Sequence, residues 1–256
     1  MLLTIDAGNT NVTIGIFDGS RILTRWRLRT APDQTPDEWG IKLRSLFDLE
    51  NVPLARIKGI AAASVVPPLE SSLREMGRRY FSIEPMFVTG STETGVSVLY
   101  DNPREVGADR IVNAVAALAR YGGPCIVVDL GTAITFDAVS ANAEYLGGII
   151  CPGIGMSIQG LFTRTARLPM VDFREPEKLI GSNTVGSMQS GLYHGTISMI
   201  DGIVERMIAQ MGPATKTVAT GGHANLITRG SKFVTTADED LTLEGLRLIW
   251  ERNRGA

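Results

Sequence analysis

Hydrophobic and polar residues form three consecutive runs at the start of the chain. Residues 2–5 form a mainly apolar run that ends at Asp6, a second and β-branched run covers residues 12–17, and residues 20–29 alternate between apolar and polar side chains. Alternation with a period of two is typical of strands with one buried face. The pattern therefore predicts a three-stranded antiparallel meander, with a tight hairpin turn between its first two strands.

The spacing then changes to that of alternating helices and strands. Thr35, followed by acidic residues in the next turn, is a helix-start signal, and apolar residues recur at helical spacing as far as Phe47. The next elements expected are a buried strand at 57–66, a helix at 69–80 and a short strand at 86–88. The first part of the chain is therefore expected to form a βββαβα unit.

The meander recurs halfway along the chain. Residues 125–131, 132–139 and 143–151 repeat the three-strand pattern. A Gly-Gly-Pro sequence just before them breaks the preceding helix and marks a boundary. We therefore expect two similar α/β domains, residues 1–118 and 119–256, that face each other across a central cleft.

Each meander opens on an Asp-x-Gly turn. The first is Asp6-Ala7-Gly8-Asn9-Thr10 and the second is Asp129-Leu130-Gly131-Thr132. A strand that ends in this way offers a carboxylate, a glycine backbone that a ligand can approach closely, and amide and hydroxyl donors. One such turn is an ordinary hairpin signal, but two in matching contexts predict a site for the phosphates of a nucleotide and their metal ion.

Asp109 is a further candidate for function. Apolar residues at helical spacing follow it, so a helix is expected to start near this position. As a helix cap, Asp109 would satisfy free backbone amides. Its carboxylate could instead serve as a general base, and Arg110 could be either a ligand contact or a solvated charge. The local sequence leaves these interpretations open.

Composition and charge exclude several classes of protein. Of the 256 residues, 44% are hydrophobic and 20% are charged, which is typical of a globular protein rather than a disordered one. The net charge is −2 without a marked basic cluster, so nucleic acid is not an expected partner. No apolar run approaches membrane-spanning length, so we expect a cytoplasmic location and no membrane contact. Cys125 and Cys151 lie among aliphatic residues and are expected to be buried thiols.

Motifs along essentially the whole chain resemble those of the type III pantothenate kinases, a family of the actin-like ATPase superfamily. In order, they are Asp6-Ala7-Gly8-Asn9-Thr10, Gly107-Ala108-Asp109-Arg110, Asp129-Leu130-Gly131-Thr132-Ala133, Gly147-Gly148-x-Ile150-x-Pro152-Gly153, Asn183-Thr184 and Thr220-Gly221-Gly222. The resemblance implies two duplicated ribonuclease-H-like domains, each with a mixed five-stranded sheet and helices. It also implies an enzyme, a transferase that moves the γ-phosphoryl group of ATP to pantothenate in the first step of coenzyme A biosynthesis.

The resemblance also implies roles for individual residues. Asp109 would be the general base, Asp6 the carboxylate nearest Mg²⁺, and Asp129 the ligand of a monovalent cation, K⁺ or NH₄⁺. ATP would be bound by Asp6, Ala7, Gly8, Asn9, Thr10, Asn11, Val12, Thr13 and Thr132. Pantothenate would be bound by Tyr100, Gly107, Ala108, Asp109, Arg110 and Thr184, at the interface of a homodimer.

Two alternatives keep the fold but change the function. Some proteins of this family were first described as accessory factors for transcription, so the chain could be a regulatory protein. It could also be a kinase of the superfamily that acts on another small acceptor, such as a sugar or acetate. The phosphate-loop sequence Gly-x-x-x-x-Gly-Lys-Ser/Thr is absent, which argues against the unrelated P-loop pantothenate kinases.

Overall fold

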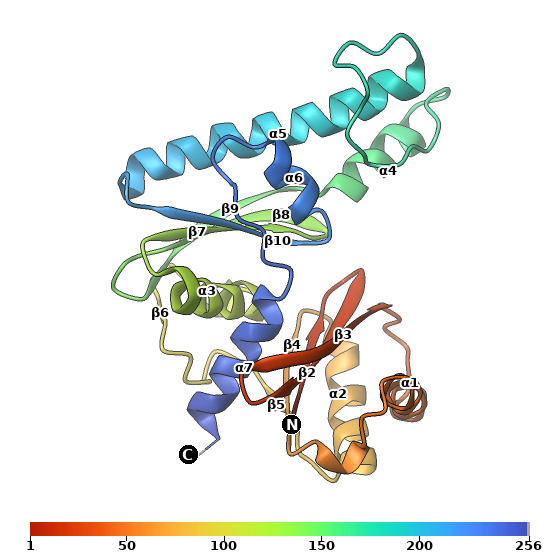
Figure 1. The fold of residues 1–256 in the computed structure, drawn as a ribbon, viewed down its shortest axis with the longest axis vertical. Coiled ribbons are helices and arrows are strands. Elements are labelled where there is room, and N and C mark those ends of the chain that lie inside the picture. The colour runs from red at the N-terminus through yellow and green to blue at the C-terminus, as the bar shows by residue number, and fades with distance from the viewer. Residues whose placement is uncertain (255–256) are drawn as a thin grey trace. The chain divides into compact units, whose positions relative to one another are not determined.

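The computed structural model describes residues 1–254, which fold into two compact units (Figure 1). The first unit contains Met1–Val96, Asp101–Ala116 and the chain from Thr242 onward. The second contains Ser97–Tyr100 and Ala117–Leu241. The C-terminal helix therefore belongs to the first unit, whereas the sequence pattern groups all of residues 119–256 in one domain.

The first sheet has the strand order β3-β2-β1-β4-β5 and confirms the predicted meander. β1 and β2 are antiparallel, as are β2 and β3, while β4 is parallel to both β1 and β5. In Figure 1, β1 to β3 carry the red colours of the N-terminus. The strands are β1 (Leu2–Ala7), β2 (Asn11–Asp18), β3 (Arg21–Arg29), β4 (Gly59–Ser64) and β5 (Met86–Phe87).

Helices cover both faces of this sheet. On one face, α1 (Pro36–Leu49) and α2 (Pro67–Met76), which continues as a π-helical turn at Gly77–Phe81, bury the aliphatic side chains of β1 and β2. On the other face, α3 (Ala108–Tyr121) and α7 (Leu241–Asn253) pack through Val112, Leu246 and Ile249. The predicted start of α1 is confirmed, because the Thr35 side chain accepts from Glu38 N and Thr35 N donates to the Glu38 carboxylate at 2.8 Å.

The second sheet has the order β10-β7-β8-β9-β6. Its fifth strand is β6, which pairs in parallel with β9 and comes from a stretch where the sequence predicted no regular structure. β6 has only two residues, too few for any periodic pattern to emerge. The strands are β6 (Ser97–Val98), β7 (Cys125–Leu130), β8 (Ala133–Val139), β9 (Glu144–Pro152) and β10 (Lys216–Gly221).

Three helices complete the second unit, and two short 3₁₀ turns lie between other elements. The long helix α5 packs its buried side, including Leu192, Ile200 and Val204, into the same core as the strands. Cys125 is buried as predicted, and burial raises the pKa of its thiol to about 12, whereas Cys151 is only half-buried. The helices are α4 (Ile154–Arg164), α5 (Thr184–Met211) and α6 (Ala224–Gly230), and the 3₁₀ turns are Leu54–Arg56 and Pro103–Glu105.

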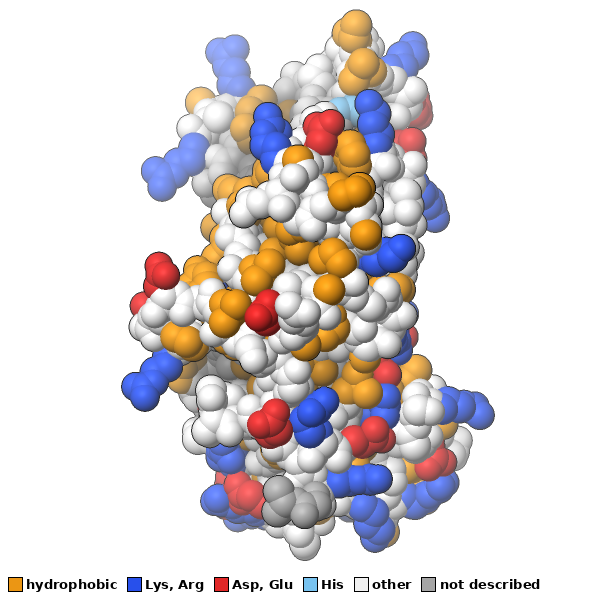
Figure 2. All heavy atoms as spheres, turned by 90° about the vertical axis from the view of Figure 1, so that its left-hand side faces the viewer, with side chains coloured by type: hydrophobic (Ala, Val, Ile, Leu, Met, Phe, Trp, Pro, Cys, Tyr) orange, Lys and Arg blue, Asp and Glu red, His pale blue; other side chains and the backbone are white. Residues whose placement is uncertain are grey.

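The surface mixes charges of both signs. On the face shown in Figure 2, lysine and arginine side chains are interspersed with acidic ones, and hydrophobic side chains lie between them. Within residues 1–254, no helix is long and apolar enough to cross a membrane.

Candidate active site

The turn after β1 is held in place by its own backbone and by Thr30. Gly8 N donates to the Asn11 carbonyl at 3.0 Å, Thr30 N donates to the Thr10 carbonyl at 3.0 Å, and Thr30 Oγ1 donates to the Gly8 carbonyl at 2.6 Å. Thr30 follows β3, whose last residue pairs with Asn11. Thr30 is not among the site residues predicted from the sequence, although its hydroxyl just after the third strand was a usable signal.

Asp6 lies at the end of β1, on the face of the sheet opposite the α1 core. Its neighbours Ile5 and Ala7 belong to that core, and side chains alternate between faces along a strand. Asp6 is half-buried and pairs with Thr13 on β2 and Ala63 on β4. The carboxylate therefore lies beside the turn that follows β1 and not in the hydrophobic core.

Asp109 lies in the first turn of α3, at the end of the first sheet where the Asp6 turn also lies. A side-chain carbon placed on Gly107 would lie 2.5 Å from Asp109 Oδ1 and 3.8 Å from Val65 Cγ1, so the helix start packs closely there. Val65 in turn donates its N–H to the Ala7 carbonyl at 3.1 Å. The first unit thus brings the Asp6 turn and the sequence Gly107–Arg110 together.

The surroundings of Asp109 make its carboxylate more basic than usual. Burial raises its pKa, and a hydrogen bond from Arg110 N to Oδ1, at 2.8 Å, together with the Arg110 charge, opposes that shift only in part. The same Arg110 amide, at the helix start, also donates to the Gly107 carbonyl at 3.1 Å. The two interpretations that the sequence left open are therefore compatible: Asp109 can bond to the helix end and still accept a proton.

Asp129 ends β7 among glycines in the second unit. A side-chain carbon on Gly221 would lie 2.9 Å from Asp129 Oδ1 and 2.7 Å from the Leu130 carbonyl, and one on Gly131 would lie 3.6 Å from Asp129 Oδ1. Gly221 has a φ of +89°, which side-chain-bearing residues rarely adopt. Because glycine has no side chain, these positions leave space beside the Asp129 carboxylate and the Leu130 carbonyl. Carboxylate and carbonyl oxygens are the ligands that hard cations prefer.

The turn after Asp129 is tightly packed. A side-chain carbon on Gly153 would lie only 1.9 Å from the Thr132 carbonyl, so the strand-to-helix turn between β9 and α4 rests directly on the Thr132 loop. Gly147 also lies close to an aromatic side chain, because a carbon placed on it would lie 3.5 Å from the Tyr100 ring. Tyr100 also contacts Tyr145, with ring centroids 6.4 Å apart.

Thr184 is the first residue of α5 and is exposed. The side chain of the preceding Asn183 caps the helix by accepting from Gly186 N at 2.8 Å. Both residues line a pocket of about 730 Å³ that also includes Leu161, Leu168, Met188 and Leu192. The candidate pantothenate residues therefore fall in three places: Gly107–Arg110 in the first unit, and Tyr100 and Thr184 at separate elements of the second.

Comparison with known proteins decides the family. The family model of the type III pantothenate kinases matches residues 2–206. The chain is also 59% identical, over 253 residues, to a type III pantothenate kinase of Solibacter usitatus, an alignment that covers 99% of this chain and 97% of its relative. The chain belongs to the type III pantothenate kinase family. The chain that contains all six motifs is therefore a member of this family. The structure adds the contacts that these motifs make, as described above.

Solved structures share the fold of this pantothenate kinase family member at low sequence identity. A 2-dehydro-3-deoxygalactonokinase from Sinorhizobium meliloti, described as putative, has a TM-score of 0.62 at 12% identity, with 99% of this chain and 97% of that chain covered. A Baf family transcriptional activator from Campylobacter jejuni, also described as putative, has a TM-score of 0.57 at 19% identity, with 99% and 100% covered. Both confirm the predicted fold, and neither decides between the alternative functions.

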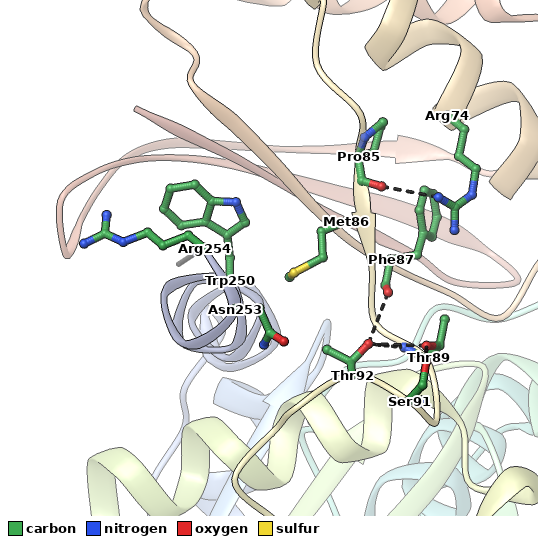
Figure 3. Close-up of a pocket in the computed structure, with 10 residues that line it drawn as sticks. All are labelled: Arg74, Pro85, Met86, Phe87, Thr89, Ser91, Thr92, Trp250, Asn253 and Arg254. Carbon is green, nitrogen blue, oxygen red and sulfur yellow. Dashed lines mark hydrogen bonds between the residues drawn. The ribbon is translucent and has the colours of Figure 1, made fainter. Parts of the chain in front are cut away.

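A further pocket, of about 500 Å³, lies away from the pantothenate kinase motifs (Figure 3). It is formed at β5 and the end of α7, between Met86, Thr92 and Trp250. The hydroxyl groups of Thr89, Ser91 and Thr92 bond to one another. Of its two arginines, Arg74 is held by Glu70 and Glu84 and by the Pro85 carbonyl, and Arg254 lies over the Trp250 ring, 5.4 Å from its centroid. These polar groups already have partners, so the pocket is not the candidate site.

Proposed function

We propose that this protein transfers the γ-phosphoryl group of ATP to the primary hydroxyl of pantothenate, which gives 4'-phosphopantothenate and ADP. This is the first step of coenzyme A biosynthesis. The observation that carries the proposal is the full-length similarity to type III pantothenate kinases. The geometry of the first unit agrees with the proposal. The turn at Gly8, which suits the phosphates of a nucleotide, and the Asp109 carboxylate, whose pKa is raised, lie at the same end of one sheet.

Residues 6–13 bind the phosphates of ATP in this proposal, and Thr132 adds a contact from the second unit. The Gly8 turn suits the role, since its backbone is fixed by Thr30 and its glycine leaves room for close approach. Asp6 is the carboxylate nearest Mg²⁺, which neutralises charge on the transferring phosphate when bound. Among residues 1–254 no group of three His, Cys, Asp or Glu could hold a metal. This fits Mg²⁺, which is usually held by one or two carboxylates, phosphates and water.

Asp109 accepts the proton of the pantothenate hydroxyl as that oxygen attacks the γ-phosphorus. A general base works best when its pKa approaches the working pH, and burial moves the pKa of Asp109 in that direction. Arg110, which is buried beside it, together with Gly107 and Ala108, holds the acceptor in place. Positioning of this kind provides much of the rate in phosphoryl transfer.

Asp129 binds a monovalent cation, K⁺ or NH₄⁺. Support comes from the glycine-lined space at Asp129 Oδ1 and the nearby Leu130 carbonyl. A carboxylate close to the phosphates of ATP would repel them unless a cation compensates its charge. The cation therefore belongs to the nucleotide site.

Activity is expected to rise when K⁺ or NH₄⁺ is added to protein prepared in a Na⁺-free, K⁺-free buffer. The added cation compensates the negative charge of Asp129, so Asp129→Ala, which removes that charge, should reduce the rise in rate. Initial rates against salt concentration measure this, with tetramethylammonium chloride as the control for ionic strength. Equal rates with K⁺ and with tetramethylammonium would contradict the assignment.

The protein acts as a homodimer, and the pantothenate site includes Thr184 at its interface. Support comes from a group of exposed apolar side chains on α4, in the segment between α4 and α5, and at the start of α5, of which Ile180 is 85% exposed. Exposed apolar surface of this kind is typical of a protein interface. The group consists of Met156, Leu161, Phe162, Met170, Leu179, Ile180 and Val185.

Ile180→Glu is expected to shift the protein from dimer to monomer, because a charge would then have to be buried in an apolar interface. Sedimentation velocity at micromolar concentration measures the change. Ile41→Glu is the matched control, since Ile41 is 65% exposed on α1 and lies outside this group. A monomeric wild type, or a dimer unchanged by Ile180→Glu, would contradict the proposed interface.

An acceptor panel tests the proposed function. The purified protein, with MgATP and K⁺, is given pantothenate, glucose, N-acetylglucosamine or acetate, and ADP formation is followed. We expect ADP formation that depends on pantothenate alone. ADP formation with a sugar or acetate instead would identify a different kinase of the same fold, and none with any acceptor would favour a regulatory role.

A further inference from the structure

The proposed phosphate-binding turn has no cation of its own. Residues 6–13 contain Asp6 but no lysine or arginine. Phosphoryl-transfer sites usually place an arginine or lysine on the transferring phosphate in addition to the metal ion, because negative charge is spread over its oxygens in the transition state. The cation is therefore expected from another element that faces the turn.

Strand register puts one arginine in the same row as Asp6. Asp6 pairs with Thr13 on β2, and Thr13 pairs with Arg27 on β3. Directly paired residues point to the same face of a sheet. Two strand spacings separate Asp6 from Arg27, about 9.6 Å, and an extended arginine side chain covers most of that distance.

The face on which Arg27 lies is fixed independently by its neighbour. The ring of Trp26 stacks on Phe47 of α1, with centroids 5.9 Å apart, so Trp26 faces the hydrophobic core. Arg27 therefore faces the opposite side, where Asp6 lies. Its side chain is exposed, and within residues 1–254 it makes no hydrogen bond or ion pair with another side chain.

On this face, α7 packs over the row of side chains next to that of Arg27. The next row toward the start of β1 joins Thr4, Gly15 and Arg25. It is covered by α7, since a side-chain carbon on Gly15 would lie 2.9 Å from Leu243 Cδ1. The Asp6–Thr13–Arg27 row lies one step beyond, toward the phosphate turn, and Arg27 at the β3 end of this row is exposed.

We infer that Arg27 is an ATP-binding residue whose guanidinium donates hydrogen bonds to the γ-phosphate. This inference rests on the proposed kinase function. An arginine fork matches phosphate oxygens and keeps its charge at any working pH. A purely structural explanation exists as well, because β3 is an edge strand and charged residues on edges discourage pairing with other chains. The two explanations differ in what they predict for nucleotide binding.

Titration calorimetry of MgATP and MgADP into the full-length protein, without pantothenate, separates them. Arg27→Gln is expected to weaken MgATP binding at least about tenfold, which is the loss of affinity expected when one charge-assisted hydrogen bond is removed. MgADP binding should change less than about twofold, because ADP has no γ-phosphate. Arg27→Lys should recover part of the ATP affinity. Arg21→Gln is the matched control, since Arg21 is exposed on the same strand but six residues, about 20 Å, from Arg27.

Each other result counts against the inference. If the wild type binds MgATP and Arg27→Gln binds it equally well, Arg27 is only an edge-strand charge, and the proposed function still stands. Equal losses for ATP and ADP would overturn the assignment to the γ-phosphate. A wild-type protein that binds neither nucleotide would overturn both this inference and the proposed function.

Discussion

Asp109→Asn is expected to lower kcat at least about a hundredfold while the melting temperature stays close to that of the wild type. An amide cannot accept the hydroxyl proton, and general bases contribute on the order of 10² to 10⁴ in rate. Asparagine can still accept the N–H of Arg110, so the helix start keeps its hydrogen bond. Steady-state kinetics with pantothenate, together with thermal melts and ATP titrations of both proteins, measure these quantities.

The link between protonation and folding explains why Asp109→Asn should not lower the stability of the protein. The folded-state pKa of Asp109 is raised by burial, so the protonated carboxyl adds stability below its unfolded-state pKa, and this is lost as the pH rises through the folded-state value. Above the folded-state pKa none of it remains for asparagine to lose. The wild-type rate should also fall, as the pH is lowered, at a higher pH than for an ordinary carboxyl. Near-normal turnover with an unchanged melting temperature would leave Asp109 as a helix cap only.

Asp6→Asn is expected to weaken MgATP binding roughly 10- to 150-fold and to lower turnover, without loss of the fold. The estimate corresponds to about 1.5–3 kcal/mol for a lost charged interaction. Asp6 lies half-buried at a strand end outside the hydrophobic core, so its replacement leaves no cavity. Calorimetric titrations with ATP, with and without Mg²⁺, measure the effect.

The metal dependence identifies the cause of the Asp6 effect. If Asp6 acts through Mg²⁺, the variant loses affinity for MgATP but binds metal-free ATP at least as well as the wild type, because a negative charge has been removed. Asp18→Asn is the matched control, as Asp18 ends β2 at the far end of the sheet in an exposed ion pair with Arg56 at 3.5 Å. Unchanged MgATP affinity in Asp6→Asn would remove Asp6 from the site.

Much of the first unit was predictable because its signals are local. The meander followed from an apolar run, a β-branched run and a third run with period-two alternation. The start of α1 followed from Thr35 and Glu38, whose reciprocal hydrogen bonds depend only on residues three apart. Asp6 and Asp129 were recognisable from the turn chemistry next to them. Such features involve neighbouring residues, so the sequence pattern contains them directly.

The features that were missed depend on contacts between distant segments. β6 is two residues long and is a strand only because β9 offers an edge to it. α7 follows the second sheet in the chain, yet its Leu246 and Ile249 complete the core of the first. Thr30 holds the turn at Gly8 from 22 residues away. The raised pKa of Asp109 likewise results from burial that helix periodicity alone does not reveal.

The central claim, phosphorylation of pantothenate at its primary hydroxyl, is tested most directly by identifying the product by NMR. The purified protein is incubated with MgATP, K⁺ and pantothenate, and proton-coupled ³¹P spectra are recorded. A phosphate ester on the primary hydroxyl couples to two methylene protons, so we expect a new triplet that appears with ADP and is lost in Asp109→Asn. A doublet, which would place the ester on the secondary hydroxyl, or no new ester at all while ATP is bound, would contradict this account.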